Sequence, residues 1–99
     1  TVEGVTPLNM ASRVGELEVV KALLAAKADA DKANEWGGTP LFLASKKGHL
    51  DVVEALLAAE ADVDKATVEG VTPLCIALSY GNLEIAAVLR EAGGTAPLL

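Results

Sequence analysis

The chain has 99 residues, a formal net charge of −6 and a pI of about 4.6. This acidic balance disfavours contact with a nucleic-acid phosphate backbone, and no apolar run approaches the roughly 20 residues that span a bilayer. The single cysteine, Cys75, excludes an internal disulfide and a cysteine-based zinc site, so we expect no cofactor and an intracellular location in a reducing compartment, the cytoplasm.

The sequence repeats itself every 33 residues. The motif Gly-x-Thr-Pro-Leu occurs three times, starting at Gly4, Gly37 and Gly70. The period divides the chain without remainder, which predicts three units at residues 1–33, 34–66 and 67–99. A stack of similar units presents a long surface and rarely builds a closed catalytic pocket.

In the first unit, Thr6 and Pro7 predict the start of a short helix. The threonine hydroxyl can cap the first turn, and proline is tolerated at the first helical position because its missing N–H has no partner there. Leu8, Met10 and Ala11 supply the apolar face of this helix. It is expected to end at Gly15, since glycine enters the left-handed conformation at little cost.

A second helix is predicted from Leu17 to about Ala26. Apolar residues recur in it at helical spacing: Leu17, Val19, Val20, Leu23 and Leu24. Because only a tight turn separates the two helices, we expect them to lie antiparallel. From Ala28 onward the pattern gives way to Asp, Lys, Asn and Gly, which predicts a projecting loop or hairpin toward the next unit.

The third unit changes character after Leu89. Residues 90–99 lack the Ala-Asp-x-Asp-Lys loop of the other units, and Pro97 does not favour another helix pair. We therefore expect the array to end here. An apolar end without a polar cap predicts either further repeats upstream or end-to-end self-association.

The recurring positions of the units resemble the ankyrin repeat. Gly-x-Thr-Pro-Leu and an Ala in the first helix occur in all three units, whereas Gly-x-Leu-Glu/Asp-Val-Val opening the second helix, Leu-Leu in its middle and Ala-Asp-x-Asp after it are complete in the first two. The resemblance covers the whole chain and implies an all-α solenoid of stacked antiparallel helix pairs with projecting β-hairpin/loop connections. A tetratricopeptide array is the nearest alternative, but its period and its Trp/Tyr pattern differ.

The chain also departs from the family pattern. The histidine that usually follows Thr-Pro-Leu is replaced by Asn9, Phe42 and Cys75, and of these only Asn9 is expected to keep part of the hydrogen-bonded linkage between loops. The glycine that usually follows the second helix is Lys27 in the first unit and Glu60 in the second. If the backbone is left-handed there, each costs on the order of 1 kcal/mol.

The resemblance further implies a concave face, made of loop tips and the exposed sides of the first helices, that binds another protein. Several of its positions differ between units whereas the framework positions do not. Carried over by position, this face comprises Val2, Glu3, Val5, Arg13 and Val14 in the first unit, Glu35, Trp36, Gly38, Lys46 and Lys47 in the second, and Val68, Glu69, Val71, Ser79 and Tyr80 in the third.

Aromatic and basic residues stand out on this face. Trp36 lies in a polar loop, so we interpret it either as a binding anchor or as a side chain lying across its own or a neighbouring loop. Tyr80, just before a glycine, is a similar candidate. Lys46 and Lys47 indicate an acidic spot on the partner, although lysines at a helix end are also favoured by the helix dipole.

Enzymatic candidates are few. A thiol–imidazole pair of Cys75 and His49 is disfavoured because His49 falls in the turn between helices and Cys75 in a buried first helix. The Asp-x-Asp pairs at 29–31 and 62–64 lack the glycine and glutamate of a calcium loop, and we expect them to be solvated turn residues. We predict a non-enzymatic protein-interaction module or scaffold. The alternatives are a self-assembling or spacer array acting through its ends, and a binding domain cut from a larger enzyme.

Overall fold

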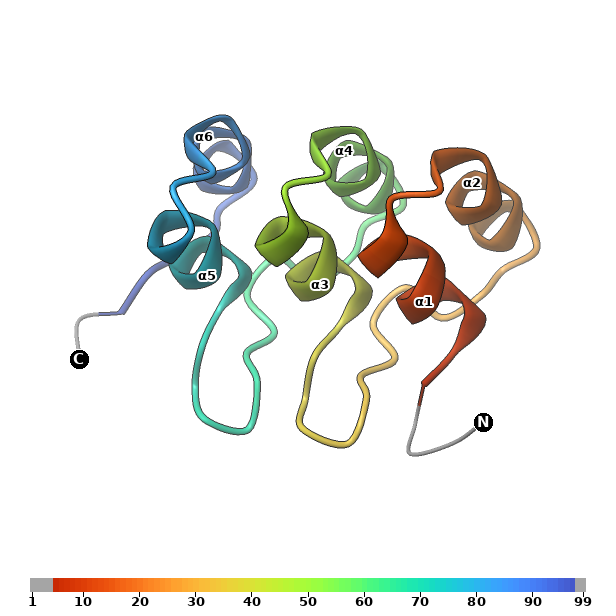
Figure 1. Cartoon of the computed structure of the whole chain (residues 1–99), viewed down its shortest axis with the longest axis horizontal. Coiled ribbons are helices and arrows are strands. Elements are labelled where there is room, and N and C mark those ends of the chain that lie inside the picture. Colours follow the sequence, from red (N-terminus) through yellow and green to blue (C-terminus); the bar gives the residue numbers. More distant parts are fainter. Residues whose placement is uncertain (1–4, 98–99) are drawn as a thin grey trace.

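The computed structural model describes residues 5–97, which form three successive helix pairs and, within that range, no strand (Figure 1). The helices are α1 (Pro7–Val14), α2 (Leu17–Ala25), α3 (Pro40–Lys47), α4 (Leu50–Ala58), α5 (Pro73–Ser79) and α6 (Leu83–Glu91). The predicted solenoid of antiparallel helix pairs is confirmed. The unit boundaries at 33/34 and 66/67 fall inside continuous loops and stay predictions.

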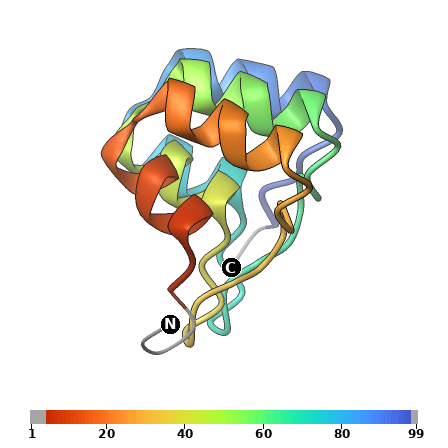
Figure 2. The ribbon, with the colours of Figure 1, turned by 90° about the vertical axis from the view of Figure 1, so that its right-hand side faces the viewer.

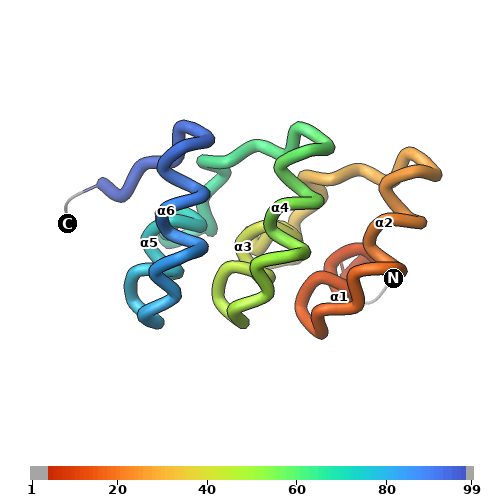
Figure 3. The backbone as a smooth tube through the Cα atoms, turned by 90° about the horizontal axis from the view of Figure 1, so that it is seen from above, coloured from red at the N-terminus to blue at the C-terminus, as the bar shows by residue number. Residues whose placement is uncertain are grey.

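The helices form two layers. The first helices of the pairs (α1, α3 and α5) lie side by side in one layer, and the second helices (α2, α4 and α6) lie side by side in the other (Figures 2 and 3). Loops project beyond the first layer (Figure 1). Their turns are closed by backbone hydrogen bonds at 3.0 Å, from Asn34 N to Gly38 O in one loop and from Thr67 N to Val71 O in the next. The connections described are therefore loops with hairpin-like tips.

The first helices begin as the Thr-Pro dipeptides predict. Each threonine has an extended backbone, and its hydroxyl accepts a hydrogen bond of 3.1 Å from the backbone N–H three residues ahead. This bond satisfies one of the N–H groups that a helix start leaves without a partner. The capping threonines are Thr6, Thr39 and Thr72.

Left-handed residues end most of the helices. Gly15 and Gly48 close α1 and α3 with φ of 91° and 83°. Lys27 and Glu60, which follow α2 and α4, have φ of 69° and 65° although they carry side chains. The backbone is therefore strained at both positions, as expected if these residues replace the usual glycine of the repeat.

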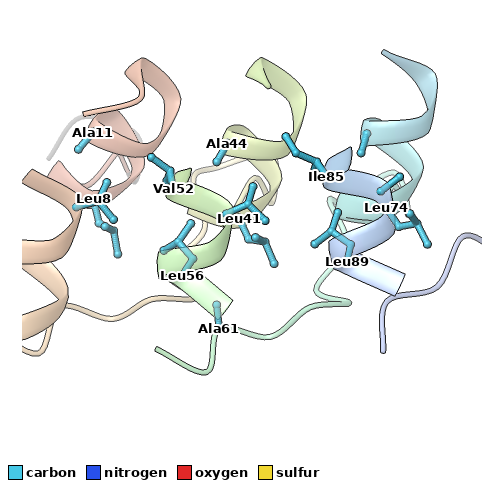
Figure 4. Close-up of a cluster of buried hydrophobic side chains, with 14 residues drawn as sticks. Leu8, Ala11, Leu41, Ala44, Val52, Leu56, Ala61, Leu74, Ile85 and Leu89 are labelled. Atoms are coloured by element: carbon cyan, nitrogen blue, oxygen red, sulfur yellow. The ribbon is translucent and has the colours of Figure 1, made fainter. Parts of the chain in front are cut away.

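The core runs through the stack between the two helix layers (Figure 4). Leu8, Leu41 and Leu74, at equivalent positions of the first helices, are almost completely buried. Val52 and Ile85, on the second helices, are also buried, whereas the equivalent Val19 is 43% exposed. Val19 was expected to be a core residue, but no unit packs against it within residues 5–97, so burial depends on a neighbour.

Hydrogen bonds join the units at the turns between the two helices of a pair. Just before α4, His49 Nε2 donates to the Arg13 carbonyl of the preceding unit at 3.1 Å, and just before α6, Asn82 Nδ2 donates to the Ser45 carbonyl at 2.8 Å. The His49 ring fits because Gly15 has no side chain: a Cβ there would lie 2.6 Å from the ring. These contacts fix the spacing of the stack.

The loops are joined as well. Asn9 Nδ2 donates to the Lys32 carbonyl at 3.1 Å, which confirms the predicted linkage. Asp31 accepts from the Asp62 N–H at 2.8 Å, and one unit later Asp64 accepts from a backbone N–H at the same distance. The expectation of merely solvated turn carboxylates is thus corrected, because these aspartates bond to the next loop.

Replacing Lys27 or Glu60 by glycine is expected to stabilise the fold. Glycine relieves the left-handed strain, which is worth on the order of 1 kcal/mol at each position. The free energy of unfolding in urea measures the gain. Ala59→Gly serves as the control, because its φ of −88° suits any residue and the substitution should be destabilising. Equal or lower stability of Lys27→Gly and Glu60→Gly would contradict this account.

Candidate functional site

The residues that the sequence assigned to the concave face lie on the loop tips and first helices, and they differ in exposure. Val2 and Glu3 lie outside the described residues. Val5, Lys46 and Val71 are half-buried, and the exposed members are Arg13, Val14, Glu35, Trp36, Lys47, Val68, Glu69, Ser79 and Tyr80. Gly38 is buried and does not form part of the exposed surface. Each of the three units therefore contributes exposed residues to the predicted face.

Trp36 occupies a defined position in the middle of this face. Its ring meets Phe42 edge to face, with centroids 5.5 Å apart and an interplanar angle of 77°. It also lies over Gly38, where an added Cβ would be 2.8 Å from the indole. Of the interpretations above, the structure has the indole lying across its own loop, yet 40% of the residue remains exposed. The side chain is both supported and accessible.

The backbone around Trp36 is held from two directions. Within the loop, Asn34 Oδ1 accepts hydrogen bonds from the N–H groups of Trp36 at 3.2 Å and Gly38 at 2.8 Å. From the next loop, the Val68 N–H donates to the Trp36 carbonyl at 3.0 Å. The backbone that carries the indole is therefore held both by its own loop and by the next one.

Two hollows flank the indole, and Trp36 lines both. The larger, about 330 Å³, opens between the second and third units, and its other lining residues are Phe42, Lys46, Thr67, Val68, Glu69, Val71 and Ile76. The smaller, about 230 Å³, opens between the first and second units, and its other lining residues are Val5, Asn9, Met10, Arg13, Asn34 and Leu43. Both are mainly apolar recesses with a basic side chain in the wall.

Met10 and its equivalents contribute to these hollows, which the sequence did not predict. Met10 was assigned to the apolar side of its helix, but it is 44% exposed and lines the smaller hollow. The residues 33 and 66 positions later, Leu43 and Ile76, also line a hollow. The signal that could have identified them is that an apolar residue recurs directly after positions 9, 42 and 75.

Basic side chains occupy the last turns of α1 and α3. Arg13 and Lys46 are equivalent by the repeat, and each lines one hollow. The Lys46 ammonium lies 5.9 Å from the centroid of the Tyr80 ring, within the range of a cation–π contact. Arg13 Nη2 lies 3.1 Å from the Met10 sulfur. Each basic group thus lies against an aromatic or sulfur-containing side chain.

The residues considered for catalysis are arranged differently. His49 is engaged with the Arg13 carbonyl, while Cys75 lies in the first turn of α5 and is half-buried rather than buried as expected. Within residues 5–97, no cluster of three or more His, Cys, Asp or Glu could hold a metal ion. None of the helices in the same range combines the length and apolarity needed to cross a membrane.

Comparison with protein families agrees with this geometry. A family model for ankyrin repeats, in three copies, matches residues 8–97. The chain belongs to the ankyrin-repeat family. A comparison with curated proteins found no match. Ankyrin repeats are generally protein-interaction modules and typically lack catalytic activity.

In this ankyrin-repeat chain, Gly38→Ala is expected to displace the indole. The new Cβ would lie 2.8 Å from Trp36 Cη2 and 3.2 Å from Asn34 Nδ2, which is closer than such atoms pack. Since Trp36 is the only tryptophan, its fluorescence should shift to longer wavelength and be quenched more readily by acrylamide, with the far-UV circular dichroism unchanged. Ser79→Ala, on the same face, is the control. Unaltered emission and quenching in Gly38→Ala would show that the indole does not rest on Gly38.

Proposed function

We propose that this chain is a protein-interaction module whose ankyrin repeats bind a partner protein through the concave face. The observation that carries the proposal is Trp36, which is fixed by its own loop, exposed, and bordered by hollows on both sides. The contact residues proposed are Val2, Glu3, Val5, Arg13, Val14, Glu35, Trp36, Lys46, Lys47, Val68, Glu69, Val71, Ser79 and Tyr80.

The proposal is supported by the fact that Trp36 is held in place by its surroundings and yet remains exposed. A tryptophan that only stabilised its loop would gain most by burying its whole ring, since burial of apolar area is the favourable term. Here a large part of the residue stays in water while its backbone is held by Asn34 and Val68. Preordered aromatic side chains beside pockets are the residues that contribute most to binding at interfaces.

Trp36→Ala is expected to weaken partner binding by roughly 30-fold or more, equivalent to about 2 kcal/mol, with helicity retained. Immobilised wild-type chain, Trp36→Ala and Glu54→Ala would be compared in a quantitative pull-down from extracts of the cells that produce the protein. Glu54 is exposed on α4, in the other helix layer, so its substitution should preserve capture. Capture of every protein equally by all three baits would rule out a role for this face.

A second function, end-to-end assembly with copies of the same chain, is favoured by the exposed ends of the stack. Val19 is 43% exposed, whereas its equivalents Val52 and Ile85 are at most 3% exposed. At the other end Leu83 is 68% exposed, whereas the equivalent Leu50 is half-buried. The last unit of one copy could therefore cover the first unit of another, in a head-to-tail contact that does not close.

If this assembly operates, static light scattering should give an average mass that rises above 10.1 kDa with concentration. Leu83→Glu and Val19→Glu should each hold the chain at the monomer mass, because a charge would be buried without a partner in the contact. Val68→Glu, exposed on a loop tip, should associate like the wild type. A constant monomer mass at all concentrations of the wild type would exclude the assembly function.

A further inference from the structure

The two hollows beside Trp36 are of a size suited to side chains. Their volumes, about 330 and 230 Å³, lie at or below the lower end of the range for sites that enclose drug-sized ligands. Phe42 and Ile76 line the larger hollow, and Met10 and Leu43 line the smaller. Each hollow therefore suits an apolar side chain projecting from another protein, with the indole between the two.

Charge is distributed unevenly around the hollows. Arg13 lines the smaller hollow, whose lining includes no carboxylate among the residues described. Lys46 lines the larger hollow at the end of α3, and the only carboxylate in that lining is Glu69, on the loop tip. The side of the face formed by the ends of α1 and α3 is thus positive, in a chain whose net charge is −6.

The helix dipole explains why basic residues are favourable in these last turns, but it does not explain their recurrence beside the hollows. The last turns of α2 and α4 carry no basic residue, and of the second helices only α6 has one, Arg90. Lys46 leans over the Tyr80 ring, which attracts a cation without neutralising it as a carboxylate would. Its ammonium is therefore available to a group on another molecule.

We propose that the partner of this face is a protein segment of alternating apolar and acidic side chains. One apolar side chain enters the hollow on each side of Trp36, and a carboxylate pairs with Lys46 and another with Arg13. The proposal rests on the proposed function of the concave face and adds the chemistry of the partner. Because Arg13 and Lys46 are 33 residues apart and equivalent in the repeat, the stack binds the same combination of one apolar and one acidic side chain at two successive positions.

The partner's charge is the feature that an experiment can isolate. Burial of the hollows on binding removes water around Lys46 and Arg13, and a charge pair is stronger when water is removed. A partner carboxylate would then gain, and a partner lysine would be repelled. The association rate should also fall as salt rises, since salt screens the attraction between the basic side chains and an acidic partner before the contact forms.

The test is selection of a displayed library of random peptides against the wild-type chain. The selected peptides are expected to be enriched in Asp and Glu next to aromatic or aliphatic residues, and to bind Lys46→Glu about tenfold more weakly. Lys21→Glu is the matched control: it makes the same charge change at an exposed position of α2, and should alter affinity less than twofold. Arg13→Glu provides a second variant, and circular dichroism checks that each variant keeps its helices.

Each contrary outcome has a distinct meaning. Selected peptides that depend on Trp36 but show no acidic excess, or that bind Lys46→Glu and Lys21→Glu equally, would overturn the acidic partner and leave the proposed function standing. Peptides that bind Trp36→Ala as well as the wild type would count against the proposed function itself. Failure to select any peptide would overturn the inference, and self-association in light scattering that Trp36→Ala abolishes, while Leu83→Glu retains it, would identify a second copy as the occupant of the face.

Discussion

Each helix pair depends on a neighbouring pair, because two short helices cannot cover both of their apolar sides. The equivalent residues Val19 and Val52 show the effect: the same side chain is 43% exposed in the first repeat and fully buried in the second. Stability in such a stack is the sum of contacts between adjacent units. The remaining features, including the loops that carry the candidate site, are positioned by that stacking.

The stacking also explains why the candidate site lies where it does. The Trp36 loop is supported from below by Gly38 and Phe42 of its own repeat, and it is bonded at its carbonyl to Val68 of the next. The hollows on its two sides lie between consecutive repeats. A site of this kind cannot exist in one isolated repeat, because half of each hollow comes from a neighbour.

Local features of the fold could be predicted from the sequence, and those that depend on distant residues could not. The caps at Thr6 and its equivalents and the left-handed turn at Gly15 involve residues within one turn of each other, so the residue types define them. The position of the Trp36 ring depends on the missing Cβ of Gly38 and on a loop about 30 residues away. Sequence reasoning therefore gave alternatives for this side chain and could not choose between them.

The links between repeats were only partly visible in the sequence. The bond from Asn9 to the next loop was expected from its position, but the aspartates at 31 and 64 were not recognised as caps of a neighbouring loop. Their role requires two loops to lie at one fixed spacing, which is a property of the stack. The 33-residue period contained the clue, since equivalent aspartates recur at that interval.

Small side chains on the first helices have a consequence for the spacing of the loops. Ala11, Ala44 and Ala77 are at most 7% exposed and belong to α1, α3 and α5, which pack side by side. Small side chains at a helix contact allow the helix axes to approach closely. Three methyl groups that are almost completely buried therefore help to set the distance between the loop tips of successive repeats.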